Sequence, residues 1–269
     1  MKKERIDILL IERRLVDSRS LAQKIIMAGN VLVDGQIIDK PSTKVNIDSK
    51  ILVSSGPKFV SRGGEKLEPA LIKFGFENLD GIICADLGSS TGGFTDCMLQ
   101  YGAKRVYAVD VGYGILHWKL RTDSRVVVME RMNARYLTSF PEPIDFVTID
   151  ASFISLKTLL PGVFSWVSED GNVIVLIKPQ FEAGKQEAAR GSGVIRDPLI
   201  HKKIVFETLT FAKELGFEIK GLMESPIKGP KGNIEFLSWM QKVKNPSTTV
   251  QEIETFISSI FKEDFQVIE

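Results

Sequence analysis

Two amphipathic patterns open the chain. Within residues 6–16, apolar side chains recur at helical spacing, with charged residues on the opposite side; they are Ile6, Leu9, Leu10 and Leu15. The polar run 17–20 offers capping side chains for a second helix, and Gly29 followed by Asn30 provides its stop. The second helix is expected to turn three apolar side chains inward, Leu21, Ile25 and Ile26. This stretch therefore predicts two consecutive helices.

A β-hairpin is predicted directly after the second helix. Residues 31–38 contain two short apolar runs around the turn dipeptide Asp34-Gly35. Two helices and a hairpin together predict a compact α+β module. The run 54–58, with the sequence SSGPK, has linker composition. We therefore expect a small domain over residues 1–55, a linker over 56–62 and a larger domain over 63–269.

Beyond residue 80 the chain alternates short β-branched runs with helical patterns. The predicted strands are 82–87, 105–109, 125–129, 146–149 and 173–177, and the helical patterns between and after them are 93–100, 156–166 and 202–215. Such alternation is typical of an α/β fold with a mainly parallel sheet covered by helices on both faces. The stretch after Gly216 and the run 234–239 are expected to add an antiparallel edge pair, and 250–261 a packing helix.

Composition excludes several classes of protein. The chain has 269 residues, with 35 Lys+Arg against 34 Asp+Glu and 43% hydrophobic residues, which is ordinary for a globular protein. No apolar run approaches the roughly 18 residues of a membrane helix. The charged start lacks the features of a signal peptide, so we expect a cytoplasmic protein. Cys84 and Cys97 lie in apolar segments without a CxxC pattern, and we expect reduced core residues and no metal site.

The charge is unevenly distributed. Residues 1–60 carry 11 basic and 7 acidic residues, whereas residues 61–269 carry 24 basic and 27 acidic ones. A basic module on a nearly neutral body is expected of a protein that holds a polyanion such as RNA or DNA at one end. The solvated basic face of an ordinary small domain would give the same distribution.

The segment 84–94 carries the most informative motif. A strand is expected to end at Leu87, a glycine-containing turn follows, and a helix begins near Gly93. Open α/β sheets bind ligands at the carboxyl ends of their strands. A dinucleotide fingerprint needs a glycine where this chain has Ser90, which argues against a nicotinamide enzyme and favours a ligand without phosphates, such as an adenosyl amino acid.

A second acidic residue follows the next predicted strand. Asp110 is placed to accept hydrogen bonds from the ribose hydroxyls of a bound adenosine, although a lone acid after a strand is often a helix cap. Asn133, after the third strand, is expected near the adenine. The complete set of expected cofactor contacts is Asp86, Gly88, Ser89, Ser90, Gly92, Gly93, Phe94, Asp110 and Asn133.

Four charged residues lie in or beside apolar segments. Asp150 and Lys178 each follow a predicted strand, so both are expected at the rim that carries the glycine turn. Lys66 opens a helix before the first strand, and Glu235 lies in the segment 229–237. Burial of any one of them without a partner would be costly. Taken singly, each is equally well explained as a structural ion pair or an exposed charge.

Two parts of the chain resemble known families. The run SRSLAQKIIMAGNVLVDGQII, with the helix before it, resembles the S4 RNA-binding domain over roughly residues 5–53. The runs SRGGEKL, DLGSSTGGF, FVTIDASF, VIVLIKPQF and GNIEF resemble, in order, the motifs of FtsJ-like S-adenosylmethionine-dependent 2′-O-ribose methyltransferases. The combination is similar to the TlyA family, whose members carry the historical name haemolysin A.

The resemblance implies a Rossmann-like methyltransferase domain behind an S4-like domain. It further implies S-adenosyl-L-methionine as cofactor, ribosomal RNA or a ribosomal subunit as partner, and a tetrad of Lys66, Asp150, Lys178 and Glu235. Lys178 would act on the 2′-hydroxyl as base or as stabiliser of the oxyanion, with Lys66 as second cation and the two carboxylates orienting them. Expected RNA contacts are Arg13, Arg14, Arg19, Lys24, Arg62, Lys185, Arg190 and Lys231, of which Lys185 and Arg190 belong to an expected mobile loop over 181–194.

Other functions compatible with these patterns are a membrane-active haemolysin and a non-catalytic RNA-binding factor on a methyltransferase fold. The sequence offers no spanning helix for the former. His117 and His201 have no partner pattern and are expected to be exposed or satisfied in the core. Nothing in the chain indicates an oligomeric state.

Overall fold

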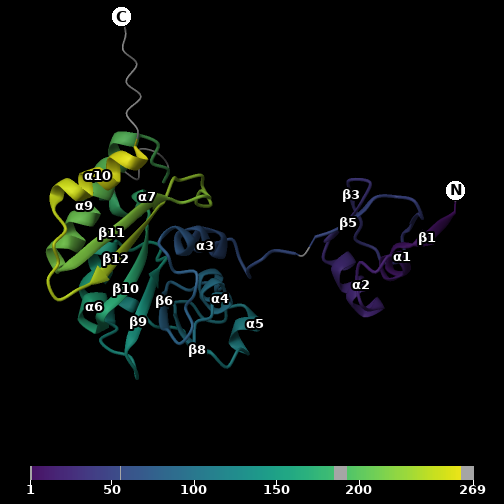
Figure 1. The fold of residues 1–269 in the computed structure, drawn as a ribbon, viewed down its shortest axis with the longest axis horizontal. Coiled ribbons are helices and arrows are strands. Elements are labelled where there is room, and N and C mark those ends of the chain that lie inside the picture. The colour runs from purple at the N-terminus through teal and green to yellow at the C-terminus, as the bar shows by residue number, and fades with distance from the viewer. Residues whose placement is uncertain (1, 55, 185–192, 262–269) are drawn as a thin grey trace, which may run out of the picture. The chain divides into compact units, whose positions relative to one another are not determined.

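The computed structural model describes residues 2–54, 56–184 and 193–261. The chain divides into two compact units, Met1–Lys58 and Phe59–Glu269, whose elements are labelled in Figure 1. Phe59 and Val60, which the sequence placed in a linker, belong to the second unit. Phe59 is buried there, and the Val60 amide donates to Asp96 Oδ2 at 2.9 Å.

The first unit contains the two predicted helices and the predicted hairpin. Its elements are β1 (Lys3–Arg5), α1 (Ile6–Glu12), α2 (Arg19–Met27), β2 (Val31–Val33), β3 (Gln36–Ile37), β4 (Lys44–Asn46) and β5 (Ile51–Val53). β1 pairs with β4, and β3, β2 and β5 form a second small sheet. Ser18 caps α2 by accepting a hydrogen bond from the Leu21 amide at 3.2 Å.

The prediction that Leu15 and Leu21 are buried in the core of the first unit is wrong. Leu15 is exposed because α1 ends at Glu12, three residues before it. Leu21 is also exposed, because α2 buries Ala22 and Ile26, which are four residues apart and share one face. The core otherwise contains the predicted Ile6, Leu9 and Leu10, packed with residues of β2 and β4.

The second unit is built on a seven-stranded sheet, as expected for the α/β class. Its strands are β6 (Ile83–Leu87), β7 (Arg105–Val109), β8 (Val126–Met129), β9 (Ile144–Ile149), β10 (Val167–Ile177), β11 (Phe217–Glu224) and β12 (Phe236–Lys242), in the order β11-β12-β10-β9-β6-β7-β8. The strands from β10 to β8 are mutually parallel. β12 pairs antiparallel with both β10 and β11, which confirms the predicted antiparallel edge.

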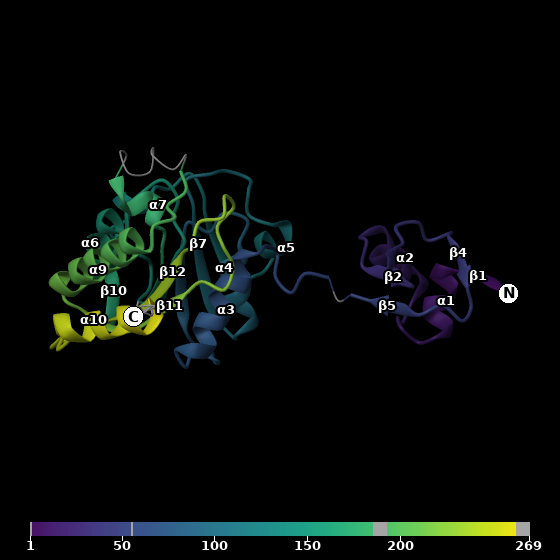
Figure 2. The ribbon, with the colours of Figure 1, turned by 90° about the horizontal axis from the view of Figure 1, so that it is seen from above.

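Helices cover both faces of this sheet (Figures 1 and 2). They are α3 (Gly63–Lys73), α4 (Gly93–Gln100), α5 (Trp118–Arg121), α6 (Leu156–Trp166), α7 (Pro179–Glu182), α9 (Pro198–Leu215) and α10 (Val250–Ile260), with a 3-10 turn η1 (Ala134–Tyr136). Figure 2 shows α9 and α10 on one side of the sheet and α3 and α4 on the other.

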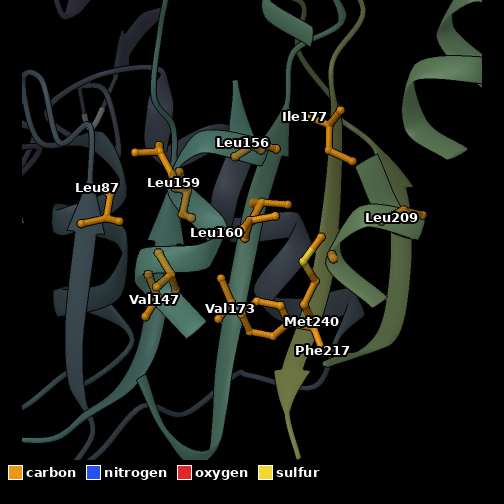
Figure 3. Close-up of a cluster of buried hydrophobic side chains, with 14 of the residues drawn as sticks. Leu87, Val147, Leu156, Leu159, Leu160, Val173, Ile177, Leu209, Phe217 and Met240 are labelled. Carbon is orange, nitrogen blue, oxygen red and sulfur yellow. The ribbon is translucent and has the colours of Figure 1, made fainter. Parts of the chain in front are cut away.

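Alternation along the strands divides the second unit's core into two layers. Val173, Val175 and Ile177 of β10 pack with α6 and α9, and Figure 3 shows Leu159, Leu160 and Leu209 of those helices in this layer. The intervening residues Ile174 and Leu176 pack instead with α3 and α4. Cys84 and Cys97 lie in this second layer as buried free thiols, as predicted.

Truncation of Phe217 tests the first of these layers. Phe217 is fully buried, and the centroid of its ring lies 4.9 Å from the centroid of the Phe164 ring. We expect Phe217→Ala to lower the free energy of unfolding of the second unit by about 3–5 kcal/mol, because the cavity is added to the lost burial. All three tryptophans, at 118, 166 and 239, lie in this unit, so their fluorescence during urea unfolding reports on it.

Leu199→Ala is the matched control. Leu199 is exposed on α9, and its truncation is expected to change the free energy of unfolding by less than about 0.5 kcal/mol. Equal unfolding midpoints for Phe217→Ala and the wild type would contradict the packing described here.

Candidate active site

A pocket of about 740 Å³ opens at the carboxyl ends of the parallel strands in the second unit. Its lining comes from the start of α3, the turn after β6, the residues that follow β9, those that follow β10, Gly193 before α9, and the loop before β12. This is the edge at which open α/β sheets bind ligands. The volume lies in the range of small-molecule sites, roughly 300–1,000 Å³.

Lys66 and Glu235 form an ion pair at this pocket, although 169 residues separate them in sequence. Lys66 Nζ lies 2.7 Å from Glu235 Oε2, and both side chains are buried. Gln180 Nε2 donates to the other carboxylate oxygen of Glu235 at 3.1 Å. Glu235 therefore has both oxygens occupied and is held between the first turn of α3 and the start of α7.

Asp150 and Lys178 form the second ion pair. Lys178 Nζ lies 2.6 Å from Asp150 Oδ1 and donates to Ser152 Oγ at 3.0 Å. The two residues follow β9 and β10, which are neighbours in parallel register. Lys178 is buried, and its Nζ lies 5.7 Å from the centroid of the Phe181 ring. All four residues of the predicted tetrad thus line one pocket as two ion pairs.

The turn after β6 touches the end of β9. Gly88 has a φ of +85°, and a Cβ at this position would lie 2.8 Å from the carbonyl oxygen of Asp150. Ser90 also has a positive φ, of +50°, and its amide donates to Asp110 Oδ2 at 2.8 Å. Only a glycine lets the turn approach Asp150 so closely, and Asp110 fixes the turn from the other side.

The starts of α3 and α4 are in backbone contact beside the same pocket. A Cβ at Gly93 would lie 2.8 Å from Gly63 Cα and 2.8 Å from the Gly64 amide nitrogen. The contact places the first turn of α3, and with it Lys66, against the glycine turn.

The expected cofactor residues occupy different positions around this turn. Gly88, Ser89, Ser90, Gly93 and Phe94 line the pocket. Asp110 and Asn133 are not among the lining residues; Asp110 accepts from Ser90 and Gly112 amides, and Asn133 Oδ1 accepts from the Arg135 amide at 3.0 Å. Gly92 is the N-terminal cap of α4.

Asp86 lies beneath the turn and not in the pocket, which corrects the expectation of a direct cofactor contact. It is fully buried and accepts hydrogen bonds from Thr95 Oγ1 at 2.6 Å and Thr148 Oγ1 at 3.1 Å. Burial raises the pKa of its carboxyl to about 7, and the two threonine hydroxyls oppose that rise. Asp86 therefore joins α4 to β9 behind the ligand-facing surface.

Glu182 links the segments that follow β9 and β10. Its carboxylate accepts from the Leu156 amide at 2.8 Å and from Ser155 Oγ at 2.5 Å. Glu182 ends α7, four residues after Lys178, whereas Ser155 and Leu156 begin α6, a few residues after Asp150. Burial raises the pKa of the Glu182 carboxyl, while these hydrogen bonds lower it.

Among the lining residues that the sequence did not single out, Ser152, Phe153 and Gln180 lie beside the tetrad. Each lies within three residues of Asp150 or Lys178, inside the runs FVTIDASF and VIVLIKPQF. Phe153 is 91% exposed and has a φ of +64°, and its ring centroid lies 5.0 Å from that of Phe181. A search of the positions that follow each strand-end charge would have found them.

In the first unit, Arg13 forms hydrogen bonds within the domain, and its expected RNA contact stays a prediction. Its guanidinium donates to the carbonyl oxygen of Ser49 at 2.7 Å and to that of Ile47. Arg19 is exposed, with Nε 3.1 Å from the buried Asp7 carboxylate. Hydrogen bonds from Arg5 hold the pKa of Asp7 well below its usual value. Arg14 and Lys24 are exposed.

The remaining candidates lie in the second unit. Arg62 and Lys231 line the pocket, while Lys185 and Arg190 lie outside the described residues, as does most of the expected mobile loop. His117 caps α5, its Nδ1 accepting from the Lys119 amide at 3.2 Å. His201 is buried, with Nε2 3.0 Å from the Ile195 carbonyl oxygen, as expected of a satisfied core histidine.

Two family models match the chain: FtsJ-like methyltransferase over residues 59–242, and S4 domain over residues 4–51. The chain is 49% identical over 240 residues to "Putative rRNA methyltransferase YqxC" of Bacillus subtilis, covering 88% of this chain and 85% of that protein. It is 41% identical over 268 residues to "16S/23S rRNA (cytidine-2'-O)-methyltransferase TlyA" of Mycobacterium tuberculosis, covering 97% and 98%.

One solved structure is similar to nearly the whole chain. It carries the name "Putative hemolysin from Streptococcus thermophilus", is 42% identical to this chain and covers 96% of each chain with a TM-score of 0.71. In the described part of the present chain, no helix is both long and apolar enough to cross a membrane.

Asp86→Asn tests the burial of Asp86. An unfolded aspartate has a pKa near 4, so folding takes up a proton at Asp86 between about pH 4 and pH 7. The contribution of Asp86 to stability is therefore largest below about pH 4 and is lost as the pH rises toward 7. The free energy of unfolding of the variant, relative to the wild type, should rise by about 1 kcal/mol per pH unit between pH 5 and 7.

The measurement is guanidinium unfolding at pH 5, 6 and 7, followed by tryptophan fluorescence. Asp123→Asn is the control, because Arg125 lowers the pKa of the Asp123 carboxyl and its difference from the wild type should be flat over this range. A flat difference for Asp86→Asn as well would show that this carboxyl does not titrate as described.

Proposed function

Because the chain belongs to the TlyA family, with an S4 domain ahead of an FtsJ-like methyltransferase domain, we propose that it methylates a ribose 2′-hydroxyl of ribosomal RNA with S-adenosyl-L-methionine. The observation that carries this proposal is the presence of two ion pairs, Lys66–Glu235 and Lys178–Asp150, in one pocket beside the glycine turn. A ribosomal substrate implies a cytoplasmic protein. The name of the M. tuberculosis relative supports a cytidine as the target nucleotide.

The pocket fits the expected methyl donor. S-adenosyl-L-methionine, when bound, supplies an electrophilic methyl group carried on a positively charged sulfur. The residues that would hold it are Gly88, Ser89, Ser90, Gly93 and Phe94 of the pocket lining, together with Gly92, Asp110 and Asn133, which lie outside that lining. Each oxygen of Asp110 accepts one backbone hydrogen bond and keeps a lone pair for a ribose hydroxyl.

Lys178 is proposed to contact the 2′-oxygen. Its Nζ lies 2.6 Å from Asp150 Oδ1, so it is suited to donate a hydrogen bond to the oxygen as negative charge develops there. The oxygen must lose one proton when it is methylated, and in this proposal the Asp150 carboxylate, paired with Lys178, accepts that proton and passes it to solvent. This favours the stabiliser role for Lys178 over the role of free base.

Lys66 supplies the second positive charge. Its position depends on Glu235, which Gln180 in turn orients from the α7 side. Lys66, Glu235 and Lys178 are buried and Asp150 is partly exposed, so the two lysines act in surroundings of lower dielectric than bulk water, which strengthens their electrostatic effect on a reacting oxygen. The arrangement places two cations at one pocket without leaving either lysine unpaired.

The exposed ring of Phe153 is proposed to hold the base of the target nucleotide. Enzymes that act on one nucleotide draw it out of its stack and support the base on an aromatic side chain. Phe153 stands at the pocket rim, beside Phe181 and three residues after Asp150. A base on this ring would present its ribose to Lys178.

Lys178→Ala tests the proposed reaction. We expect methyl incorporation into rRNA to fall at least about 100-fold, because the group at the 2′-oxygen is removed. Affinity for S-adenosyl-L-methionine, measured by calorimetry, should stay near that of the wild type. Lys203→Ala is the control, since Lys203 is an exposed lysine of α9 and should leave incorporation unchanged.

Mass-spectrometric mapping of the labelled rRNA identifies the methylated ribose. Wild-type protein that binds RNA without transferring methyl groups would support a non-catalytic RNA-binding factor instead. Undiminished turnover in Lys178→Ala would refute the assignment of Lys178.

Phe153→Ala tests the stacking of the target base. Stacking on an aromatic side chain is worth about 1–3 kcal/mol per base, so kcat/KM for rRNA should fall roughly 10- to 100-fold. Phe153→Tyr keeps the ring and should retain most of the activity, and neither variant should alter affinity for S-adenosyl-L-methionine. Equal kcat/KM for Phe153→Ala and Phe153→Tyr would exclude this role.

A further inference from the structure

Exposed aromatic side chains gather in the two loops that follow β7 and β8. Tyr113, Trp118 and Tyr136 are 69%, 71% and 73% exposed. Among the described residues of the second unit, the other exposed aromatic side chain is Phe153 at the pocket. Large rings that are left open to water on one part of a surface mark an interaction site.

An arginine lies beside two of these rings. Arg131 Cζ is 4.1 Å from the centroid of the Tyr113 ring, and Arg135 Cζ is 5.8 Å from that of Tyr136. Within the described residues neither arginine forms an ion pair, and both are exposed. Their charges are therefore available to an anion outside the chain.

The other charged residues of these loops already have partners. Arg121 pairs with Glu130, and Arg125 Nη2 lies 2.8 Å from Asp123 Oδ2. Residues 110–137 carry five basic and three acidic residues, whereas residues 61–269 as a whole carry 24 basic and 27 acidic ones. The loops are thus a locally basic region on a unit that is otherwise slightly acidic.

Hydrogen bonds join the two loops to each other and to the pocket. The Arg131 amide donates to the Gly112 carbonyl at 3.0 Å, and the His117 amide donates to the Thr91 carbonyl at 3.2 Å. Thr91 belongs to the turn that lines the pocket. Because β7 pairs parallel with β6, and β8 pairs parallel with β7, their loops continue the same edge of the sheet.

We propose that Tyr113, Arg131, Arg135 and Tyr136, here called the loop surface, bind unpaired nucleotides of the RNA beside the target nucleotide. Tyrosine rings stack with bases of any sequence, and arginines beside them contact phosphates, which is the combination used for single-stranded nucleic acid. The inference rests on the proposed function. It assigns an RNA-binding surface to the methyltransferase unit, in addition to the RNA binding proposed for the S4 domain.

The contributions of the arginine charges and of the tyrosine rings to RNA binding are tested by two separate double substitutions. Arg131→Gln with Arg135→Gln removes two cations, and Tyr113→Ala with Tyr136→Ala removes two rings. Binding of the full chain to purified, unmodified 16S and 23S rRNA is measured by filter retention at several salt concentrations. Calorimetry with S-adenosyl-L-methionine and unfolding midpoints are recorded for every variant.

The two pairs should weaken RNA binding in different ways. The arginine pair should lower affinity at least about tenfold at low salt and reduce the slope of log K against log salt by up to about 2. The tyrosine pair should lower affinity about tenfold or more with the slope unchanged. Tyr113→Phe with Tyr136→Phe should restore binding, and affinity for S-adenosyl-L-methionine should not change.

Arg125→Gln is the matched control, since it removes the same charge at the opposite end of β8 and should change RNA affinity less than about twofold. Variants that bind rRNA like the wild type would overturn the proposal. So would a loss of S-adenosyl-L-methionine affinity in parallel, because the loop surface would then serve the cofactor. Wild-type methyl incorporation in the same preparation tests the proposed function separately.

Discussion

The candidate active site depends on backbone packing at two glycines. Gly88 lets the turn after β6 lie against the Asp150 carbonyl, and Gly93 lets α4 begin against Gly63 and Gly64 of α3. These contacts leave no room for a side chain, so the distance between the turn and the two segments is fixed by main-chain atoms. Asp150 and Lys66 take their positions from those segments, and their partners then follow through the two ion pairs.

The two ion pairs hold the charged groups of Lys66 and Lys178 at the pocket. Their presence is weak evidence that they stabilise the fold. Removing a lysine and a carboxylate from water costs free energy that their attraction repays only in good geometry. In this pocket, further hydrogen bonds hold the paired groups in place. Gln180 donates to Glu235, and Ser152 accepts from Lys178. Glu182 joins the segments that carry Asp150 and Lys178. Because these supports come from separate strand ends, the pocket is rigid where the reacting oxygen is expected.

Sequence patterns predicted the sheet and two of the four charged residues, for physical reasons. Buried parallel strands are nearly continuous apolar runs, so a charge that directly follows one, as at Asp150 or Lys178, must lie at the carboxyl edge. Lys66 and Glu235 have no such marker, and the resemblance of short motifs supplied them. The backbone contacts of Arg13 were not predicted because its acceptors are carbonyl groups 34 and 36 residues away, which no local pattern reveals. Asp86 was misjudged because side-chain alternation on β6 turns it into the layer beneath α4.

The pairing of Lys66 with Glu235 joins the first helix of the second unit to a residue 169 positions later. During translation, α3 and the glycine turn emerge from the ribosome well before β12, and the Lys66 ammonium has no carboxylate to join in the meantime. The Lys66–Glu235 pair therefore forms only after the residue that directly precedes β12 has been synthesised. A nascent or truncated chain lacking that strand is left without a complete catalytic centre, so a methyl-transfer signal reports that synthesis has passed residue 235.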